Sequence, residues 1–324
     1  NYCSSFMNGH GWALAVEKLL GVPAPPRAEA IRVILSEFSR IMDHIICVST
    51  NVVDLGAITP YFIMFRAREV IYELLEACCG ARLTVSYVRI GGLAQDVPDD
   101  FEARCRKALA SVEEVWKAAH ELLTRNVIVM NRFKDVGVMG GDEALSWGWT
   151  GPCLRGSGVD YDVRKDHPYS GYESYDFDVP VGTTGDCYDR YLVRMEEMRQ
   201  STRIIEQALA KLPSGPVITD DKRVALPPKS EVYSNIEALM NHFKLVYEGI
   251  LPPPGEVYGY TEGANGELGY YIVSDGQKHP WRVKVRPPCY NIYQAFPHMI
   301  RGGMLADAIA IIGGLNVIAG ELDR

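Results

Sequence analysis

The sequence lacks the features that mark membrane-spanning and nucleic-acid-binding proteins. No stretch approaches the roughly 20 uninterrupted apolar residues that a transmembrane helix requires. The nearest candidate, residues 308–319, is broken by a Gly pair and by Asn316. Acidic residues outnumber basic ones by 41 to 33, giving a formal net charge of -8. Because nucleic acid phosphates require a basic surface, we expect a soluble or peripheral protein that does not bind nucleic acid.

Motifs for metal binding and for self-contained catalysis are also missing. No two of the eight cysteines form a Cys-x-x-Cys pair, so we expect neither a zinc site nor an iron–sulfur cluster held by this chain. Scattered cysteines are typical of buried thiols in a reducing compartment. The seven histidines do not cluster at metal-ligand spacing, and a lone helical one such as His44 is expected to be structural. Dinucleotide, P-loop, zinc-protease and serine-hydrolase motifs are absent as well.

The remaining composition is that of an ordinary globular protein. The chain has 324 residues, 47% of them hydrophobic and 23% charged, which suits one large domain or two small ones. It begins with Asn rather than Met and enters a helical pattern almost at once, without a signal or transit peptide. We therefore expect either a processed chain or a fragment whose upstream part is missing.

Helical periodicity dominates the first 250 residues. The clearest helix covers residues 27–55, where apolar residues recur at helical spacing until Gly56. Residues 134–182 are expected to be mostly irregular, with one short helix near Glu143. The other predicted helices cover residues 3–20, 60–79, 98–126, 186–213 and 229–248.

The pattern changes after residue 255. Residues 257–261, 268–274 and 281–286 alternate with a period of two and are separated by turn signals. This predicts a small antiparallel sheet, followed by a final helix near 303–313. The predicted fold class is therefore mainly α, a helical bundle with a small antiparallel β subdomain. We expect a single domain over 1–324, with a helical core at about 1–250, the β subdomain at about 255–288, and a C-terminal helix and tail at 290–324.

One polar pair is notable on physical grounds. Thr50 and Asp54 lie one helical turn apart and share a face, which Asp43 and Cys47 continue. Asp54 falls in the last turn of its helix, where the helix dipole disfavours an anion by roughly 0.3–1 kcal/mol. Such a carboxylate either has a cationic or donor partner, or it is simply solvated.

The most distinctive run is 154–199, which concentrates Arg, Asp and Tyr ahead of a long helix. A loop this rich in charged and aromatic groups is expected to pair them with one another or with a partner. The run resembles the large, quinone-site subunit of the peripheral arm of respiratory complex I (NADH:quinone oxidoreductase), and similar stretches cover essentially the whole chain. The matching segments are AVEKLLGVPAPPRAEAIRVILSEFSRI, DLGAITPYFIMFRAREVIYELLEACCGAR, LRGSGVDYDVRK, YDFDVPVG, GDCYDRYLVRMEEMRQS, HFKLVYEG, GELGYYIVSDG, KVRPP and LADAIAIIGGLNVIAGELDR.

The resemblance implies a fold related to the large subunit of nickel–iron hydrogenases. Those proteins hold their metal with two Cys-x-x-Cys pairs, whereas this chain ends in GELDR without one. We therefore expect the same scaffold with its metal site lost and no cofactor bound by this chain. The four-iron four-sulfur cluster that supplies electrons would belong to a neighbouring subunit.

The resemblance also implies a quinone site. In the family the quinone headgroup lies between a tyrosine, which corresponds to Tyr2, and a histidine from an N-terminal hairpin. Asp54 corresponds to the aspartate that partners this histidine, and Tyr2 and Asp54 are the predicted catalytic residues. Thr50 is expected to line the cavity, with Ile46 and Phe65 as weaker candidates. A tyrosine hydroxyl can donate a hydrogen bond, and a histidine held by a carboxylate can deliver a proton to the reduced quinone.

Three departures from the family pattern matter. The N-terminal β segment that carries the histidine is missing, so it was either not included or belongs to another polypeptide. Asn1 stands where relatives usually have Asp beside the tyrosine. Thr84 stands where many relatives have a histidine near the terminal cluster.

The first functional hypothesis is a quinone-site subunit of proton-pumping complex I, enzymatic only within the complex. Its implied partners are the small iron–sulfur subunit that carries the terminal cluster, other peripheral-arm subunits and the quinone-channel membrane subunit. Its implied location is the inner membrane, on the mitochondrial matrix or bacterial cytoplasmic side. The alternatives are a non-catalytic scaffold of a related hydrogenase-like or ferredoxin-linked membrane complex and, least supported, a stand-alone soluble enzyme. In either family reading, run 154–199 is expected to serve structural pairing and contact with other subunits rather than catalysis.

Overall fold

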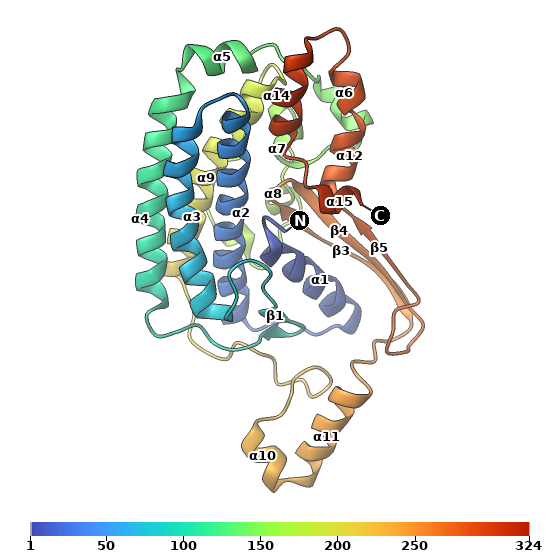
Figure 1. Ribbon diagram of the computed structural model, residues 1–324. Coiled ribbons are helices and arrows are strands. Elements are labelled where there is room, and N and C mark those ends of the chain that lie inside the picture. Colours follow the sequence, from blue (N-terminus) through green and yellow to red (C-terminus); the bar gives the residue numbers. More distant parts are fainter. Residues whose placement is uncertain (1, 324) are drawn as a thin grey trace.

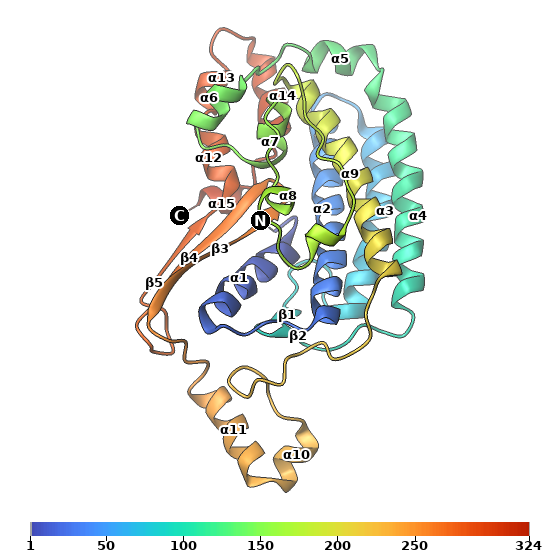
Figure 2. The ribbon, with the colours of Figure 1, turned by 180° about the vertical axis from the view of Figure 1, so that it is seen from behind.

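The computed structural model describes residues 2–323. Its body is a bundle of long helices that lie side by side (Figure 1, Figure 2). At the centre, α2 packs against α3 and α9, and α3 packs in turn against α4. Ile34, Phe38 and Ile45 are among the α2 residues with no exposed surface, as expected for a helix that is apolar around most of its circumference. The bundle helices are α2 (Pro26–Asp54), α3 (Ile58–Cys79), α4 (Phe101–Ala119) and α9 (Cys187–Ala210).

A three-stranded antiparallel sheet lies beside the bundle, with α1 (Ser5–Leu20) packed against it. The strand order is β3 (Gly255–Gly263), β4 (Gly266–Ser274), β5 (Arg282–Arg286). Gly259 permits the close approach of α1, because a Cβ added there would lie 2.5 Å from the Cα of Ala15. A two-residue hairpin connects β3 to β4, since Gly263 pairs with Gly266. The sheet predicted from period-two alternation is thus confirmed.

Short elements surround this framework. Two of them, α10 and α11, form a helical hairpin that projects from the body (Figure 1). The short elements are β1 (Val88–Arg89), β2 (Gly92–Leu93), η1 (His120–Thr124), α5 (Val127–Phe133), α6 (Gly141–Ser146), α7 (Gly151–Gly156), α8 (Val163–Asp166), η2 (Tyr172–Ser174), α10 (Lys229–Ser234), α11 (Ile236–Tyr247), α12 (Pro288–Gln294), α13 (Phe296–Met299), α14 (Leu305–Leu315) and α15 (Ala319–Leu322).

The structure differs from the sequence prediction at several places. The helix expected over 98–126 ends at Ala119 and continues as the π-helical turn η1. The helix expected over 229–248 is interrupted at Asn235, whose extended backbone and side chain cap α11. Residues 134–182 contain α7, α8 and η2 besides the expected α6. The helices α12 and α13 were not predicted, because this segment is short and begins at a Pro pair.

The mainly helical fold class with small antiparallel sheets is confirmed. The hydrogenase relationship and the division into subdomains stay predictions. Asn1 lies outside the described residues. Within residues 2–323, no helix combines the length and the apolar character needed to cross a bilayer.

Candidate functional site

The C-terminal half of α2 carries three of the predicted site residues on one face. Ile46, Thr50 and Asp54 follow one another at intervals of one helical turn. The Thr50 hydroxyl donates to the Ile46 carbonyl at 2.8 Å. Thr50 and Asp54 are exposed, and Asp54 is the last residue of α2, with no basic residue in that turn. This end of the helix is therefore open and leaves the carboxylate of Asp54 available to a cationic partner.

Tyr2 lies at the Ile46 end of this face. Its side chain is 50% exposed, and its ring lies against α15, because a Cβ added to Gly320 would approach Tyr2 Cε1 to 3.4 Å. The adjacent Cys3 is buried with Ile318, and Ile46 packs against that small cluster. Tyr2 thus precedes a residue of the cluster against which Ile46 packs, and Thr50 and Asp54 lie further along α2.

Phe65 reaches the same neighbourhood from α3 through Arg68. The Arg68 guanidinium lies 4.8 Å from the centre of the Phe65 ring and 4.6 Å from that of Tyr72. Burial raises the pKa of the Cys3 thiol to about 12, Asp43 adds to this effect, and Arg68 opposes it. Arg68 is therefore the cation of α3 that acts on the Tyr2 end of the site. Arg68 was not predicted from the sequence, although its position three residues after Phe65 places it on the same side of α3.

Four buried thiols hold α14 against this region. Three of them donate their S–H to carbonyls at or just beyond the C-terminal end of α14, where helices leave carbonyls without intrahelical partners, and Cys187 donates to Ala310 in the middle of α14. Burial raises the pKa of Cys47 to about 12 and also raises that of Cys187, which favours the protonated thiol that these hydrogen bonds require. Among residues 2–323, no cluster of His, Cys, Asp and Glu is suited to hold a metal ion. The contacts are Cys47 to Gly313, Cys153 to Leu315, Cys187 to Ala310 and Cys289 to Asn316, at 3.6, 3.7, 3.6 and 3.6 Å.

Several charged groups of run 154–199, among them Arg155, Arg164 and Glu197, are instead buried in the interior. Glu37 of α2 accepts from Arg164 at 3.1 Å and from Tyr172 at 2.6 Å. It also accepts from Ser201 at 2.6 Å and from Arg40 at 3.1 Å. Burial alone would raise the pKa of Glu37, but the two guanidinium groups and the two hydroxyl donors lower it to about 2. Glu37 is therefore an ionised carboxylate enclosed by donors.

Arg155 connects this cluster to α9 and β3. Its Nε donates to Glu197 at 2.9 Å, and its Nη1 donates to Glu262 at 2.9 Å. Arg155 holds the pKa of Glu197 well below its usual range against the effect of burial, whereas burial together with Asp162 raises the pKa of Glu262. His44 Nε2 lies 2.7 Å from Glu197 Oε2, and burial lowers the pKa of His44 despite that carboxylate. The structural pairing predicted for the run is present, while its role in contacts between subunits stays a prediction.

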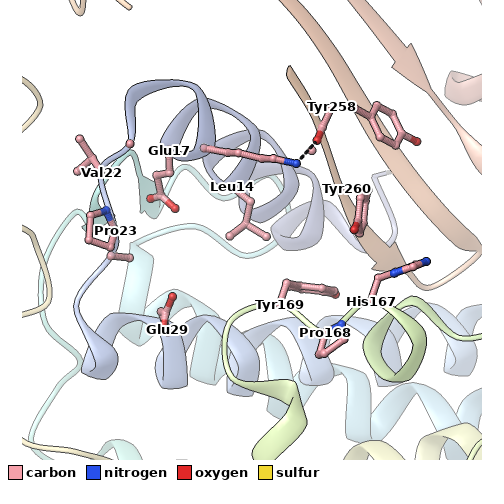
Figure 3. A pocket seen from close by; sticks show the side chains of 14 residues that line it. Leu14, Glu17, Val22, Pro23, Glu29, His167, Pro168, Tyr169, Tyr258 and Tyr260 are labelled. Atoms are coloured by element: carbon pink, nitrogen blue, oxygen red, sulfur yellow. Dashed lines mark hydrogen bonds between the residues drawn. The ribbon is translucent and has the colours of Figure 1, made fainter. Parts of the chain in front are cut away.

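A cavity of about 440 Å³ opens elsewhere, between α1, the start of α2, the 167–169 loop and β3 (Figure 3). It contains none of the five predicted site residues. Two of its charged groups already have partners within the chain: Lys18 donates to the Tyr258 carbonyl at 3.1 Å, and Glu17 binds Arg32 at 2.6 Å. The cavity is therefore separate from the candidate site on α2.

Comparison with known proteins identifies the family. Residues 54–324 match the family described as "Respiratory-chain NADH dehydrogenase, 49 Kd subunit". The chain belongs to this family. It is 56% identical over its whole length to a C/D-type NADH-quinone oxidoreductase subunit of Bdellovibrio bacteriovorus, of which it spans 58%. It is 50% identical, again over its whole length, to D-type NADH-quinone oxidoreductase subunits of Leptospira biflexa and Sorangium cellulosum, of which it spans 80% each.

Family membership confirms the resemblance seen in the sequence, but it does not test the individual site residues. Tyr2, Thr50, Asp54, Ile46 and Phe65 stay predictions that the geometry supports in different degrees. Ile46 packs against the cluster that contains Cys3, the residue after Tyr2, and Thr50 and Asp54 share the helix face of Ile46. Thr84 is exposed in the segment between α3 and β1.

Proposed function

We propose that this chain forms much of the quinone-reduction site of a proton-pumping NADH:quinone oxidoreductase. Electrons from the terminal iron–sulfur cluster of a partner subunit would reduce quinone to quinol there. The observation that carries the proposal is a half-exposed Tyr2 next to the Cys3 cluster, against which Ile46 packs at one end of a helix face that continues openly to Thr50 and Asp54. The names of the relatives, which are NADH-quinone oxidoreductase subunits, support this reaction.

The residues have complementary roles in this proposal. Reduction of a quinone takes up two electrons and two protons, and the two carbonyl oxygens become hydroxyls. The Tyr2 hydroxyl donates a hydrogen bond to one quinone oxygen, which stabilises the negative charge that develops on it. Asp54 holds the histidine that faces the other oxygen, so that its imidazole remains oriented for proton delivery. Ile46, Thr50 and Phe65 bound the headgroup.

The proposed partners follow from the same assignment. They are a small iron–sulfur subunit with a four-iron four-sulfur cluster, other peripheral-arm subunits and a quinone-channel membrane subunit. We place the chain at the inner membrane, on the matrix or bacterial cytoplasmic side. In this proposal the chain binds no cofactor of its own, which agrees with the thiols of Cys47 and Cys153 each donating to a backbone carbonyl of α14.

The test is Tyr2→Phe in the assembled complex. We expect quinone reduction by NADH to fall at least tenfold, while the terminal cluster is still reduced by NADH, as measured by electron paramagnetic resonance. Tyr293→Phe is the matched control, because Tyr293 is also partly exposed, at 36%, but lies on α12. Unchanged quinone reduction in Tyr2→Phe, with the cluster still reduced, would contradict the headgroup role and favour the alternative of a non-catalytic scaffold in a related complex.

A further inference from the structure

The hairpin of α10 and α11 exposes an unusually apolar helix face. It projects from the body of the molecule in both views (Figure 1, Figure 2). Within α11, Ala238 is the one buried residue. Six large apolar residues of this helix are between 43% and 74% exposed: Ile236, Leu239, Met240, Phe243, Val246 and Tyr247.

These six residues form one continuous stripe, which we call the α11 stripe. At about 100° per residue they fall within roughly a third of the helix circumference. Single exposed apolar side chains are common on protein surfaces, but a contiguous stripe at helical spacing is typical of a face that becomes buried. The rings of Phe243 and Tyr247 are already stacked, with centroids 5.4 Å apart. The stripe is therefore arranged for contact before any partner binds.

The body of this chain does not cover the stripe, because the body faces the opposite side of α11. A cleft of about 770 Å³ separates the hairpin from residues 23–26 and 216–228. Glu237, Ala238 and Asn241 line that cleft. At 100° per residue these positions are centred roughly opposite the stripe. Closure of the hairpin over the cleft would thus leave the α11 stripe exposed.

The charge of the hairpin disfavours a lipid surface as the occupant. Residues 229–248 contain two lysines and three glutamates. Helices that lie on anionic membranes carry an excess of Lys and Arg, which this hairpin lacks. The stripe therefore fits a protein groove better than a bilayer.

The position of the hairpin leads to the same choice. The hairpin cleft is lined by Pro25 and Pro26 at the beginning of α2, whereas Asp54 ends that helix of 29 residues. A helix of this length spans about 43 Å. In Figure 1 the hairpin projects beyond the end of the bundle where α2 begins, so it lies away from the Asp54 end of the candidate site. A site for a lipid-soluble quinone must open toward the membrane, and the hairpin is therefore not expected at the membrane surface.

We propose that the α11 stripe docks into an apolar groove on another soluble subunit of the same complex. This inference rests on the proposed function, since it takes the chain to be a peripheral-arm subunit. In this binding mode an amphipathic helix lies in a groove, and residues spaced three and four apart along the helix contact the groove. The stacked Phe243 and Tyr247 are the expected anchors, because aromatic side chains at the centre of an interface contribute most to affinity.

The experiment introduces the same charge at two adjacent positions of α11. Met240→Lys places it in the stripe, whereas Asn241→Lys places it on the cleft side. Each variant is assembled with its partner subunits, and retention of each soluble subunit is measured on the purified complex. We expect Met240→Lys to weaken the retention of one soluble subunit at least tenfold and Asn241→Lys to leave it unchanged. Circular dichroism of each purified chain confirms that it is folded.

A photoreactive amino acid at Leu239 identifies the occupant in the otherwise intact complex. A cross-link to a soluble subunit, lost when Phe243→Asp is added, supports the inference. A cross-link to lipid, to a membrane subunit or to a second copy of this chain would overturn it, as would equal retention in the two lysine variants. If the unaltered chain fails entirely to assemble with an iron–sulfur subunit, the proposed function itself fails.

Discussion

The interior charges of run 154–199 and the open face of α2 show two opposite uses of polar residues. Arg155 and Arg164 have no more than 2% exposure, and their carboxylate partners lie within the same chain. Thr50 and Asp54 are exposed at the end of a helix whose other polar side chains, such as Glu37, are enclosed. The motif that identifies the family is therefore a completed structural network, whereas the candidate chemistry lies where the chain leaves its polar groups open.

The residues joined by ion pairs within the buried network are one cation short of balance. It contains four carboxylates against three guanidinium groups, and the neutral His44 does not compensate. The raised pKa of Glu262 relieves this imbalance, because a protonated Glu262 makes the set neutral. The carboxylates are Glu37, Asp162, Glu197 and Glu262, and the guanidinium groups are Arg40, Arg155 and Arg164.

The largest expected effect comes from removing the central cation of the network. Arg155→Leu leaves Glu197 and Glu262 buried without their common partner. Breaking a buried ion pair in this way typically costs about 3–5 kcal/mol. We expect a loss of this size in the free energy of unfolding, measured by urea denaturation of the purified chain.

Arg106→Leu is the matched control for this change. Arg106 pairs with Glu102 on the surface of α4, where both side chains are more than 60% exposed. Exposed pairs contribute about 0–1 kcal/mol, so the control is expected to unfold almost as the parent chain does. Equal losses in the two arginine variants would show that burial does not distinguish the network from the surface.

The second prediction concerns Glu262 and the pH dependence of stability. Because its pKa is raised in the folded chain above the ordinary value of 4.5, the unfolded chain loses this proton first as the pH rises. Ionisation is then penalised only in the folded state, and stability falls as the pH rises towards the folded pKa. We expect Glu262→Gln to gain about 1–2 kcal/mol relative to the parent chain between pH 5 and pH 8, since one pKa unit corresponds to about 1.4 kcal/mol.

Thermal unfolding of both proteins across that pH range measures the difference. The sign of this difference decides the question. If Glu262→Gln becomes less stable relative to the parent chain as the pH rises, the ionised carboxylate is a net stabilising partner of Arg155 and the prediction is wrong. Glu267→Gln serves as a control on the adjacent strand, where the carboxylate accepts from Tyr258 at 2.6 Å but lies outside the network. An equal gain in Glu267→Gln with the same pH trend would show that the effect is not specific to the network.

The sequence predicts more about the open face of α2 than about the buried pairs of run 154–199, for physical reasons. Helical spacing places Thr50 and Asp54 on one face of α2, because this depends only on local geometry. Pairing within run 154–199 is predictable as a kind of contact, but Glu37 lies 127 residues from Arg164, and spacing does not reveal such a partner. The break at Asn235 was missed because apolar residues continue on both sides of it. Exposure of the α11 stripe depends on tertiary packing, which the local pattern does not specify.

The third prediction separates stability from activity at Asp54. Asp54→Asn removes a negative charge from the C-terminal end of α2, where the helix dipole disfavours an anion. We expect the free energy of unfolding of the isolated chain to increase by about 0.3–1 kcal/mol, while quinone reduction by the assembled complex decreases. Asp99→Asn, another exposed carboxylate, is expected to leave quinone reduction unchanged. If Asp54→Asn lowers both the free energy of unfolding and quinone reduction, Asp54 stabilises the fold and its role in activity is indirect.

The smallest effect is expected from a carboxylate that belongs to run 154–199 but lies on its surface. Asp178 is 77% exposed and pairs with Arg203 at 3.0 Å, whereas Asp162 binds Arg164 in the interior at 2.7 Å. Asp178→Asn is therefore expected to change the free energy of unfolding by less than about 0.5 kcal/mol, and Asp162→Asn by several times more. Urea denaturation of the two variants compares the same substitution in the same run. If Asp178→Asn were as costly as Asp162→Asn, the network would extend to the surface, and the boundary between enclosed and open charges would have to be redrawn.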